Sequence, residues 1–198
     1  MKVTLIQNTQ QYSGFMSLES RQLSVERFDG SEMLITREVV LRGNAAAVLI
    51  HDPVIDRFLL VKQFRAGAMA SENPWLIELV AGMVEPDEMD HEVVQRETEE
   101  EANVTLKRVV PMCRYWSSPG GSTERIALFY AEADLTDAGG VYGLADEGED
   151  IQTVLMSEAE LVNAMNSGEL DNAMTLMGVL WFLVHRADLL AARRLASE

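Results

Sequence analysis

The chain has 198 residues, which is enough for one globular domain with its own core and a modest extension. Hydrophobic residues make up 47% of it and charged residues 24%, as in ordinary soluble globular proteins. Its 32 acidic and 16 basic residues give a formal charge of −16, which repels nucleic acid and anionic membranes. We therefore expect no nucleic-acid partner, and any anionic ligand requires local arginines or a bound cation.

The signals of secreted, membrane and zinc-binding proteins are missing from the sequence. Cys113 is the only cysteine, so no internal disulfide can form, and we expect it to act as a small buried hydrophobic residue. The three histidines have no metal-ligand spacing. The N-terminus lacks an apolar run of signal-peptide length, and the longest apolar stretch, residues 177–184, is too short to span a bilayer. We expect a cytoplasmic protein with no membrane partner.

The N-terminal part of the chain alternates apolar and polar residues, which is typical of strands. The predicted strands are residues 3–6, 21–27 and 33–41, with a turn at Phe28-Asp29-Gly30. This segment is too short to build its own core, so it must pair with the main domain or with a second subunit. We predict that residues 1–41 form an N-terminal strand region for dimerisation, partly swapped between subunits, and that residues 42–198 form the main domain.

From Gly43 onward the pattern mixes strands and helices. A hairpin is predicted for residues 45–51 and 58–64, and a strand for residues 75–81. A helix then starts with Asp90 as N-cap, with Met89 and Val94 as a hydrophobic staple, and ends near Asn103.

The C-terminal part continues this mixed pattern. Further strands are predicted around residues 108–116, 126–132 and 152–156. Ser157 and Glu160 have capping-box spacing and open a helix that stops at Gly168. A last helix covers about residues 173–195, and we expect its apolar stripe to face the core; the stripe consists of Leu176, Leu180, Leu183 and Val184. The periodicity predicts the α+β class.

Residues 82–104 form the most informative segment, GMVEPDEMDHEVVQRETEEEANV. Glu97, Glu100 and Glu101 follow Arg96 at spacings that place side chains on one face of a helix. Like charges there repel by roughly a few tenths of a kcal/mol per i,i+4 pair, and Mg²⁺ would reverse this effect because it seeks carboxylate oxygens. The alternative is a solvated acidic helix face. We interpret the segment as half of a metal site that phosphate oxygens complete.

This segment resembles the signature of the Nudix hydrolase family, G-x5-E-x7-R-E-U-x-E-E-x-G-U, where U is a bulky aliphatic residue. The matching positions are Gly82, Glu88, Arg96, Glu97, Glu100, Glu101 and Val104. Thr98 replaces the first U but is β-branched and can still pack, and Asn103 replaces the second glycine but suits a left-handed helix terminus. The resemblance implies the Nudix fold, a mixed β-sheet sandwiched between α-helices (α/β/α), here with an N-terminal β extension.

Flanking segments are similar to the ADP-ribose pyrophosphatase branch of that family. They are Arg42–Ala46, Gln63–Arg65, Pro74–Leu76, Ser118–Gly121 with the branch's marker proline at Pro119, and Gly143–Ile151. GDP-mannose pyrophosphatases share the Ser-Pro-Gly-Gly element and are the competing branch. The resemblance implies a nucleoside diphosphate sugar substrate, with ADP-ribose cleaved to AMP and ribose 5-phosphate. GDP-mannose and other such sugars stay open as alternatives.

The resemblance also implies roles for the acidic residues. Glu97 and Glu101 are implied as catalytic residues and as ligands of Mg²⁺, with Mn²⁺ as another possible ion. The Ala81 carbonyl, Glu100 and Glu149 are implied as further metal ligands, Glu100 either directly or by supporting a ligand. The general base is implied at Glu147, on an acidic loop that closes over the substrate; a solvated flexible loop is the alternative. Arg96 and Glu88 are expected to form an ion pair that orients the helix.

Substrate contacts are implied at Arg65, Arg37, Glu124, Phe15 and Pro119. A guanidinium suits the diphosphate because its fork matches phosphate oxygens. Arg37 would reach the substrate from the partner subunit, which makes a homodimer the expected assembly. A sensor that binds a nucleotide sugar without cleaving it is the non-enzyme alternative, although such proteins usually lose the carboxylates that are all present here. An acidic protein of the EF-hand type is disfavoured because no EF-hand loop spacing occurs.

Overall fold

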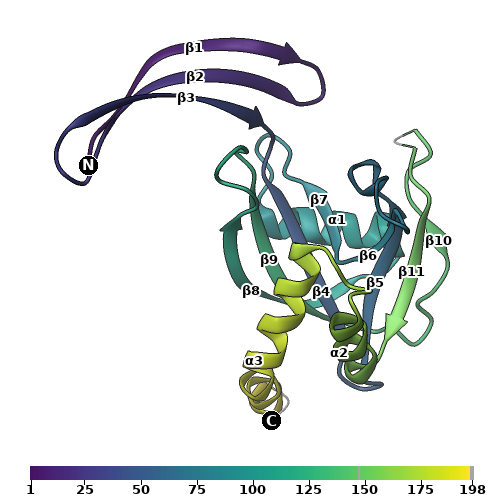
Figure 1. Ribbon diagram of the computed structural model, residues 1–198. Coiled ribbons are helices and arrows are strands. Elements are labelled where there is room, and N and C mark those ends of the chain that lie inside the picture. The colour runs from purple at the N-terminus through teal and green to yellow at the C-terminus, as the bar shows by residue number, and fades with distance from the viewer. Residues whose placement is uncertain (147, 197–198) are drawn as a thin grey trace. The chain divides into compact units, whose positions relative to one another are not determined.

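The computed structural model describes residues 1–146 and 148–196 (Figure 1). The strands are β1 (Val3–Ser13), β2 (Ser17–Glu26), β3 (Glu32–Leu41), β4 (Ala45–Asp52), β5 (Arg57–Phe64), β6 (Trp75–Glu78), β7 (Val80–Met83), β8 (Leu106–Trp116), β9 (Arg125–Ala133), β10 (Val141–Tyr142) and β11 (Ile151–Met156). The helices are α1 (Asp90–Ala102), α2 (Glu158–Ser167), α3 (Ala173–Ala196) and a short 3-10 helix, η1 (Ala66–Ala68).

The chain divides into two compact units, each of which is described by itself. The first comprises Met1–Asn44 and Tyr115–Ile126, and the second Ala45–Arg114 and Ala127–Glu198. The predicted boundary between residues 41 and 42 stays a prediction.

The first unit contains a three-stranded antiparallel sheet in the order β1-β2-β3. β1 is longer than the predicted strand at residues 3–6, because its pairing with β2 continues to Ser13. The predicted turn after β2 is present: the Gly30 amide bonds to the Arg27 carbonyl, and the Asp29 carboxylate accepts from the Ser31 amide. Every residue of β1 is exposed, so this sheet has no core of its own.

The second unit contains most of an eight-stranded sheet with the order β10-β11-β5-β4-β9-β8, to which β6 and β7 are paired at β5 and β4. Alternate residues of each strand point to opposite faces. One face packs Val48, Val61 and their neighbours against Val93 and Val94 of α1. On the other face, Phe58 packs against Phe182 of α3. The predicted α/β/α layers of the Nudix fold are confirmed.

The strand predicted for residues 75–81 is two strands, because the chain changes partner at Leu79. β6 pairs with β5, whereas β7 pairs with β4. At the change, the Leu79 amide donates to Thr175 Oγ1 (3.1 Å), and Asn172 Nδ2 donates to the Ile77 carbonyl (3.1 Å). Side chains of α3 and of the residue just before it therefore satisfy the backbone groups that the partner change would leave unpaired.

The N-terminus of α1 differs from the prediction, whereas its C-terminus agrees with it. Met89 is the N-cap, and its amide donates to Glu92 (N–Oε2 2.9 Å), so the prediction of Asp90 was wrong by one residue. Asp90 instead pairs with Arg114 of β8. Asn103 ends the helix with φ 52° and ψ 41°, the predicted left-handed conformation.

The predicted core stripe of α3 was wrong for two of its four residues, whereas Leu176 and Leu183 are half-buried. Leu180 is 50% exposed and Val184 is 77% exposed. The buried face instead consists of Thr175, Val179, Phe182 and Leu189. Apolar residues lie around most of this helix, so periodicity did not identify the inward face. In the described part of the chain, no helix is long and apolar enough to cross a membrane.

The helix before α3 follows its prediction. Ser157 caps α2 by exchanging hydrogen bonds with Glu160, and Gly168 ends it with φ 81°. A left-handed φ of this size favours glycine.

Candidate active site

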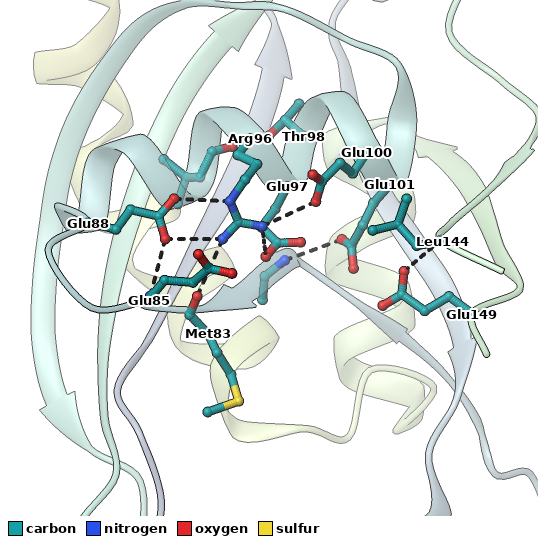
Figure 2. Close-up of polar contacts among 12 residues, drawn as sticks. Met83, Glu85, Glu88, Arg96, Glu97, Thr98, Glu100, Glu101, Leu144 and Glu149 are labelled. Carbon is teal, nitrogen blue, oxygen red and sulfur yellow. Dashed lines mark hydrogen bonds and ion pairs between the residues drawn. The ribbon is translucent and has the colours of Figure 1, made fainter. Parts of the chain in front are cut away.

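The acidic segment runs from the end of β7 through α1 (Figure 2). Glu101, on the last turn of α1, accepts a hydrogen bond from the Ala81 amide of β7 (N–Oε2 3.4 Å). A Cβ built on Gly82 would collide with the Glu97 carboxylate, so this position requires glycine. Strand and helix therefore bring Ala81, Gly82, Glu97 and Glu101 together, as the motif predicts.

Arg96 is the centre of an ion-pair network on α1 (Figure 2). Its guanidinium donates to both oxygens of Glu88 (3.0 and 3.2 Å), to Glu97 (2.7 Å) and to Glu100 (3.1 Å). It also lies 3.4 Å from the Met83 carbonyl. Glu88 belongs to the loop before α1, so the predicted pair with Arg96 is present and ties this loop to the helix. These bonds, that to Glu88 first, raise the pKa of Arg96 above its usual value.

Burial and mutual repulsion perturb the helix carboxylates. The Glu101 residue is only 2% exposed, and burial, followed by the charge of Glu97, raises its pKa to about 8. Burial likewise raises the pKa of Glu97, against the opposing effect of Arg96. The charge of Glu149 acts in the same direction on both groups. Burial and repulsion thus disfavour the charged forms of these two groups, and a bound cation would favour them.

The loop between β10 and β11 approaches these carboxylates. Glu149 is oriented by a hydrogen bond from the Leu144 amide (N–Oε2 3.1 Å), and its carboxylate lies on the Glu101 side of α1 (Figure 2). Gly143 has φ +106°, and a Cβ there would lie 2.7 Å from the Glu149 Cβ. The loop path therefore depends on a glycine at this position. Glu147, the predicted base, lies outside the described residues.

The oxygen donors of this site suit a hard divalent cation. Carboxylates and a backbone carbonyl are ligands that Mg²⁺ and Mn²⁺ accept. Among the described residues, no three His, Cys, Asp or Glu side chains are gathered closely enough to form a metal-binding group. Glu97 and Glu100 bind Arg96 instead. The arrangement fits an ion whose coordination is completed by water and phosphate oxygens, as is usual for Mg²⁺.

Arg65, a predicted substrate contact, directly follows β5. It continues the alternation of Val61, which packs on the sheet face that α1 covers. Its positive charge opposes the raised pKa of Glu101, which places the guanidinium within electrostatic reach of the carboxylates. Its Nε donates to Oε2 of Glu78 at 2.7 Å. Glu78 is absent from the predicted set of site residues. The available signal was a single charge in the otherwise apolar run Trp75–Ala81.

The other predicted substrate contacts belong to the first unit. Phe15 is 87% exposed in the turn between β1 and β2. Arg37, on β3, is exposed and its Nη1 donates to the Thr36 carbonyl. Pro119 lies in the predicted tight turn, which the Gly121 amide closes on the Ser118 carbonyl (3.1 Å).

Glu124, the remaining predicted contact, is largely buried and paired with a residue that was not predicted to act in the site. Its carboxylate lies 2.8 Å from Nε of Arg42. The Thr123 hydroxyl bonds to the Arg42 backbone on both sides, accepting from its amide and donating to its carbonyl (both 3.1 Å). The roles of these first-unit residues, and of the predicted catalytic and metal-binding residues, stay predictions.

Comparison with known proteins agrees with the site formed by α1, β7 and the loop between β10 and β11. The NUDIX domain family matches residues 41–176, which contain the whole acidic segment. The chain belongs to the NUDIX domain family. The resemblance stated from the motif is thereby confirmed.

Curated relatives of this NUDIX protein cover nearly its full length. An ADP-ribose pyrophosphatase of Haemophilus influenzae is 39% identical over 90% of this chain and 84% of its own. One from Escherichia coli K12 is 38% identical over 94% of this chain and 90% of its own. A GDP-mannose pyrophosphatase of Cronobacter sakazakii is 31% identical over 89% of this chain and 93% of its own.

A solved structure also matches the fold. The crystal structure of an ADP compounds hydrolase aligns with a TM-score of 0.73 and 16% identity, covering 95% of this chain and 96% of that one. At this identity the likeness supports the fold alone.

Proposed function

We propose that this protein is a pyrophosphohydrolase that cleaves ADP-ribose to AMP and ribose 5-phosphate with Mg²⁺, or alternatively Mn²⁺, as cofactor. The observation that carries the proposal is the buried Glu101 carboxylate, whose pKa is raised to about 8, beside Glu97 on a Nudix helix. Charges so arranged are costly unless a cation joins them. The higher identity to ADP-ribose pyrophosphatases than to a GDP-mannose pyrophosphatase supports ADP-ribose as the substrate.

The proposed chemistry is hydrolysis of a phosphoanhydride bond. A water molecule attacks one phosphorus in line, and the other phosphate leaves with the bridging oxygen. A bound divalent ion neutralises the diphosphate and polarises its P–O bonds. Glu97, Glu101 and the Ala81 carbonyl would hold the ion, and Glu149 would add a ligand from its loop. Arg96 keeps the helix carboxylates in place through its bonds to Glu97 and Glu100.

The general base and the substrate contacts complete the proposal. Glu147 would take the proton from the attacking water, delivered by the loop that also carries Glu149. Arg65 would bind phosphate oxygens through its terminal nitrogens. The remaining contacts, Phe15, Arg37, Pro119 and Glu124, would recognise the nucleoside and sugar. A homodimer, in which Arg37 acts from the partner, and a cytoplasmic location stay predictions.

Release of AMP from ADP-ribose, followed by chromatography with and without Mg²⁺, tests the function. Wild type is expected to produce AMP and ribose 5-phosphate only with the metal. Glu147→Gln is expected to lower kcat by about 10²–10⁴-fold, as for loss of a general base, with little change in affinity. Glu101→Gln should raise the Mg²⁺ concentration needed for half-maximal activity, because it removes a ligand charge. The matched control is Glu99→Gln, an exposed position on the same helix, which should behave as wild type.

The same assay separates the alternatives. Faster turnover of GDP-mannose, with GMP as product, would reassign the substrate. Tight binding of ADP-ribose without any product would indicate a sensor and contradict the proposed activity. Near-normal turnover of the Glu147→Gln variant would move the base to another acidic residue.

A further inference from the structure

Glu78 is a buried acidic residue in an apolar strand, and the proposed chemistry gives it no role. It is the last residue of β6 and is 5% exposed, between Ile77 and Leu79, which are also buried. Burial raises the pKa of its carboxyl group. A buried carboxylate is tolerated when a cation is bonded to it, and here that cation is Arg65.

The strand pairing explains how these two residues meet. Glu78 is opposite Val61 across the β5–β6 ladder, so it shares a sheet face with Val61 and with the residues two and four positions further along β5. Arg65, four residues after Val61 and just past the end of β5, continues the ladder, because its amide bonds to the Pro74 carbonyl (2.8 Å). Its side chain leans back along the strand to reach Glu78.

The bond uses only one part of the guanidinium. Glu78 Oε2 accepts from Nε at 2.7 Å, and the arginine side chain is 42% exposed while that of Glu78 is 7% exposed. No described residue is hydrogen-bonded to Nη1 or Nη2 of Arg65. The inner nitrogen is thus bonded to a buried carboxylate, which leaves the two outer nitrogens for two oxygens of one ligand group.

We propose that Glu78 is a positioning residue that holds Arg65 in the orientation in which its outer nitrogens bind the substrate diphosphate. This inference rests on the proposed function. Pre-ordering the arginine lowers the entropy lost when substrate binds, so the benefit should appear in substrate affinity. Glu78 itself does not touch the reacting atoms.

Three substitutions of Glu78 separate the effect of its side-chain length from the effect of its negative charge. Glu78→Gln keeps an acceptor oxygen at the same reach, whereas Glu78→Asp shortens the side chain and Glu78→Leu removes the acceptor. We expect Asp and Leu to raise KM for ADP-ribose by about tenfold or more with kcat changed less than about threefold, and Gln to stay within about threefold of wild type. Removing a negative charge near an anionic substrate would by itself lower KM, so a rise with leucine reports lost positioning.

Two controls distinguish positioning from damage to the fold. Thr175→Val removes the hydrogen bond to the adjacent Leu79 amide without touching Arg65; it should lower the midpoint of thermal unfolding and leave KM unchanged. In a double-mutant cycle, Arg65→Leu combined with Glu78→Asp should be no worse than Arg65→Leu alone. If the leucine variant does not fold, the ordering of Gln and Asp still decides.

Each contrary result has its own meaning. A KM unchanged in Glu78→Asp, with a raised KM in Arg65→Leu, would overturn the positioning role alone. A KM unchanged in Arg65→Leu would remove the substrate contact and this inference with it, while the pyrophosphatase activity would stand. Wild type that releases no AMP with Mg²⁺ would overturn the proposed function and the inference together.

Discussion

Glu88 and Glu101 belong to the same acidic segment, but the pKa values of their carboxyl groups are shifted in opposite directions. Glu88 is half-buried on the loop before α1, where two bonds from Arg96 lower its pKa. Glu101 is buried beside Glu97, and its pKa rises to about 8. Surroundings, and not residue type, thus decide which carboxylate serves as a structural partner of arginine and which is suited to a cation.

His51 shows the same effect far from the acidic helix. It is 3% exposed, stacked on Phe58 with ring centroids 4.2 Å apart, and its Nδ1 lies 3.0 Å from the Tyr130 hydroxyl. Burial lowers its pKa, although Asp56, 3.4 Å from Nε2, opposes this together with the charges of Asp52 and Glu132. A neutral ring that carries its proton on Nε2 satisfies both hydrogen bonds.

We predict that His51 makes the folded protein less stable in mild acid. The unfolded histidine binds a proton near pH 6.5, whereas the folded one binds it only at lower pH. The stability contribution is therefore present above about pH 6.5 and is lost as pH falls, by at most about 1.4 kcal/mol per pH unit. The measurement is urea unfolding between pH 5 and 8, for wild type and His51→Phe. Since other groups titrate too, the difference between the two proteins is the quantity to compare, and a constant difference would contradict the prediction.

At the scale of one element, α1 accommodates two residues that depart from the Nudix signature, Thr98 and Asn103. Asn103 takes the left-handed conformation, and its amide bonds to the Glu99 carbonyl at 3.0 Å. Thr98, in the aliphatic position of the motif, is fully buried, and its hydroxyl donates to the Val94 carbonyl at 2.6 Å. Both departures from the Nudix signature therefore preserve the packing that the motif requires.

Substituting Asn103 tests this capping role. Asn103→Ala should lower the free energy of unfolding by about 1 kcal/mol, because a Cβ without a polar group disfavours the left-handed conformation. Asn103→Gly, which restores the residue of the signature, should leave stability unchanged or raise it by a few tenths of a kcal/mol. Urea unfolding with circular dichroism measures both. The exposed position makes the pair a clean comparison, and equal stability of the two variants would argue against a conformational cause.

At the scale of the whole molecule, the N-terminal sheet needs a partner surface. All of β1 is exposed, and its exposed apolar residues include Val3, Leu5, Ile6 and Tyr12. A three-stranded sheet without a covered apolar face is marginal in water. The dimer expected from the sequence would cover this face with a second copy.

We predict that the full chain is a dimer at micromolar concentration and that removal of residues 1–41 makes it monomeric. The reason is the loss of the apolar sheet that would form the interface. Gel filtration with light scattering measures the mass, and the ADP-ribose assay measures the effect on activity, which should fall because Arg37 and Phe15 are lost. A full-length monomer with full activity would contradict the dimer and the action of Arg37 from the partner.

Whether a feature could be predicted from the sequence depends on how far apart in the chain its interacting residues are. The face formed by Glu97 and Glu101, the Arg96 network, the left-handed Asn103 and the Ser157 cap were all predictable, because helix spacing and capping link residues fewer than about five positions apart. The Glu88 bond to Arg96 is only slightly longer in range. The family and the α/β/α layers followed from that local pattern through resemblance.

Other features were decided only when distant segments packed together. The partner change at Leu79 depends on Thr175, the inward face of α3 depends on the aromatic residues it meets, and Glu78 meets Arg65 through the register of β5 and β6. Apolar content could not identify the buried face of α3, because Leu180 and Val184 are as hydrophobic as the buried residues. Contacts between segments far apart in the chain are set by the competition of all surfaces for burial, so they became visible only in the folded protein.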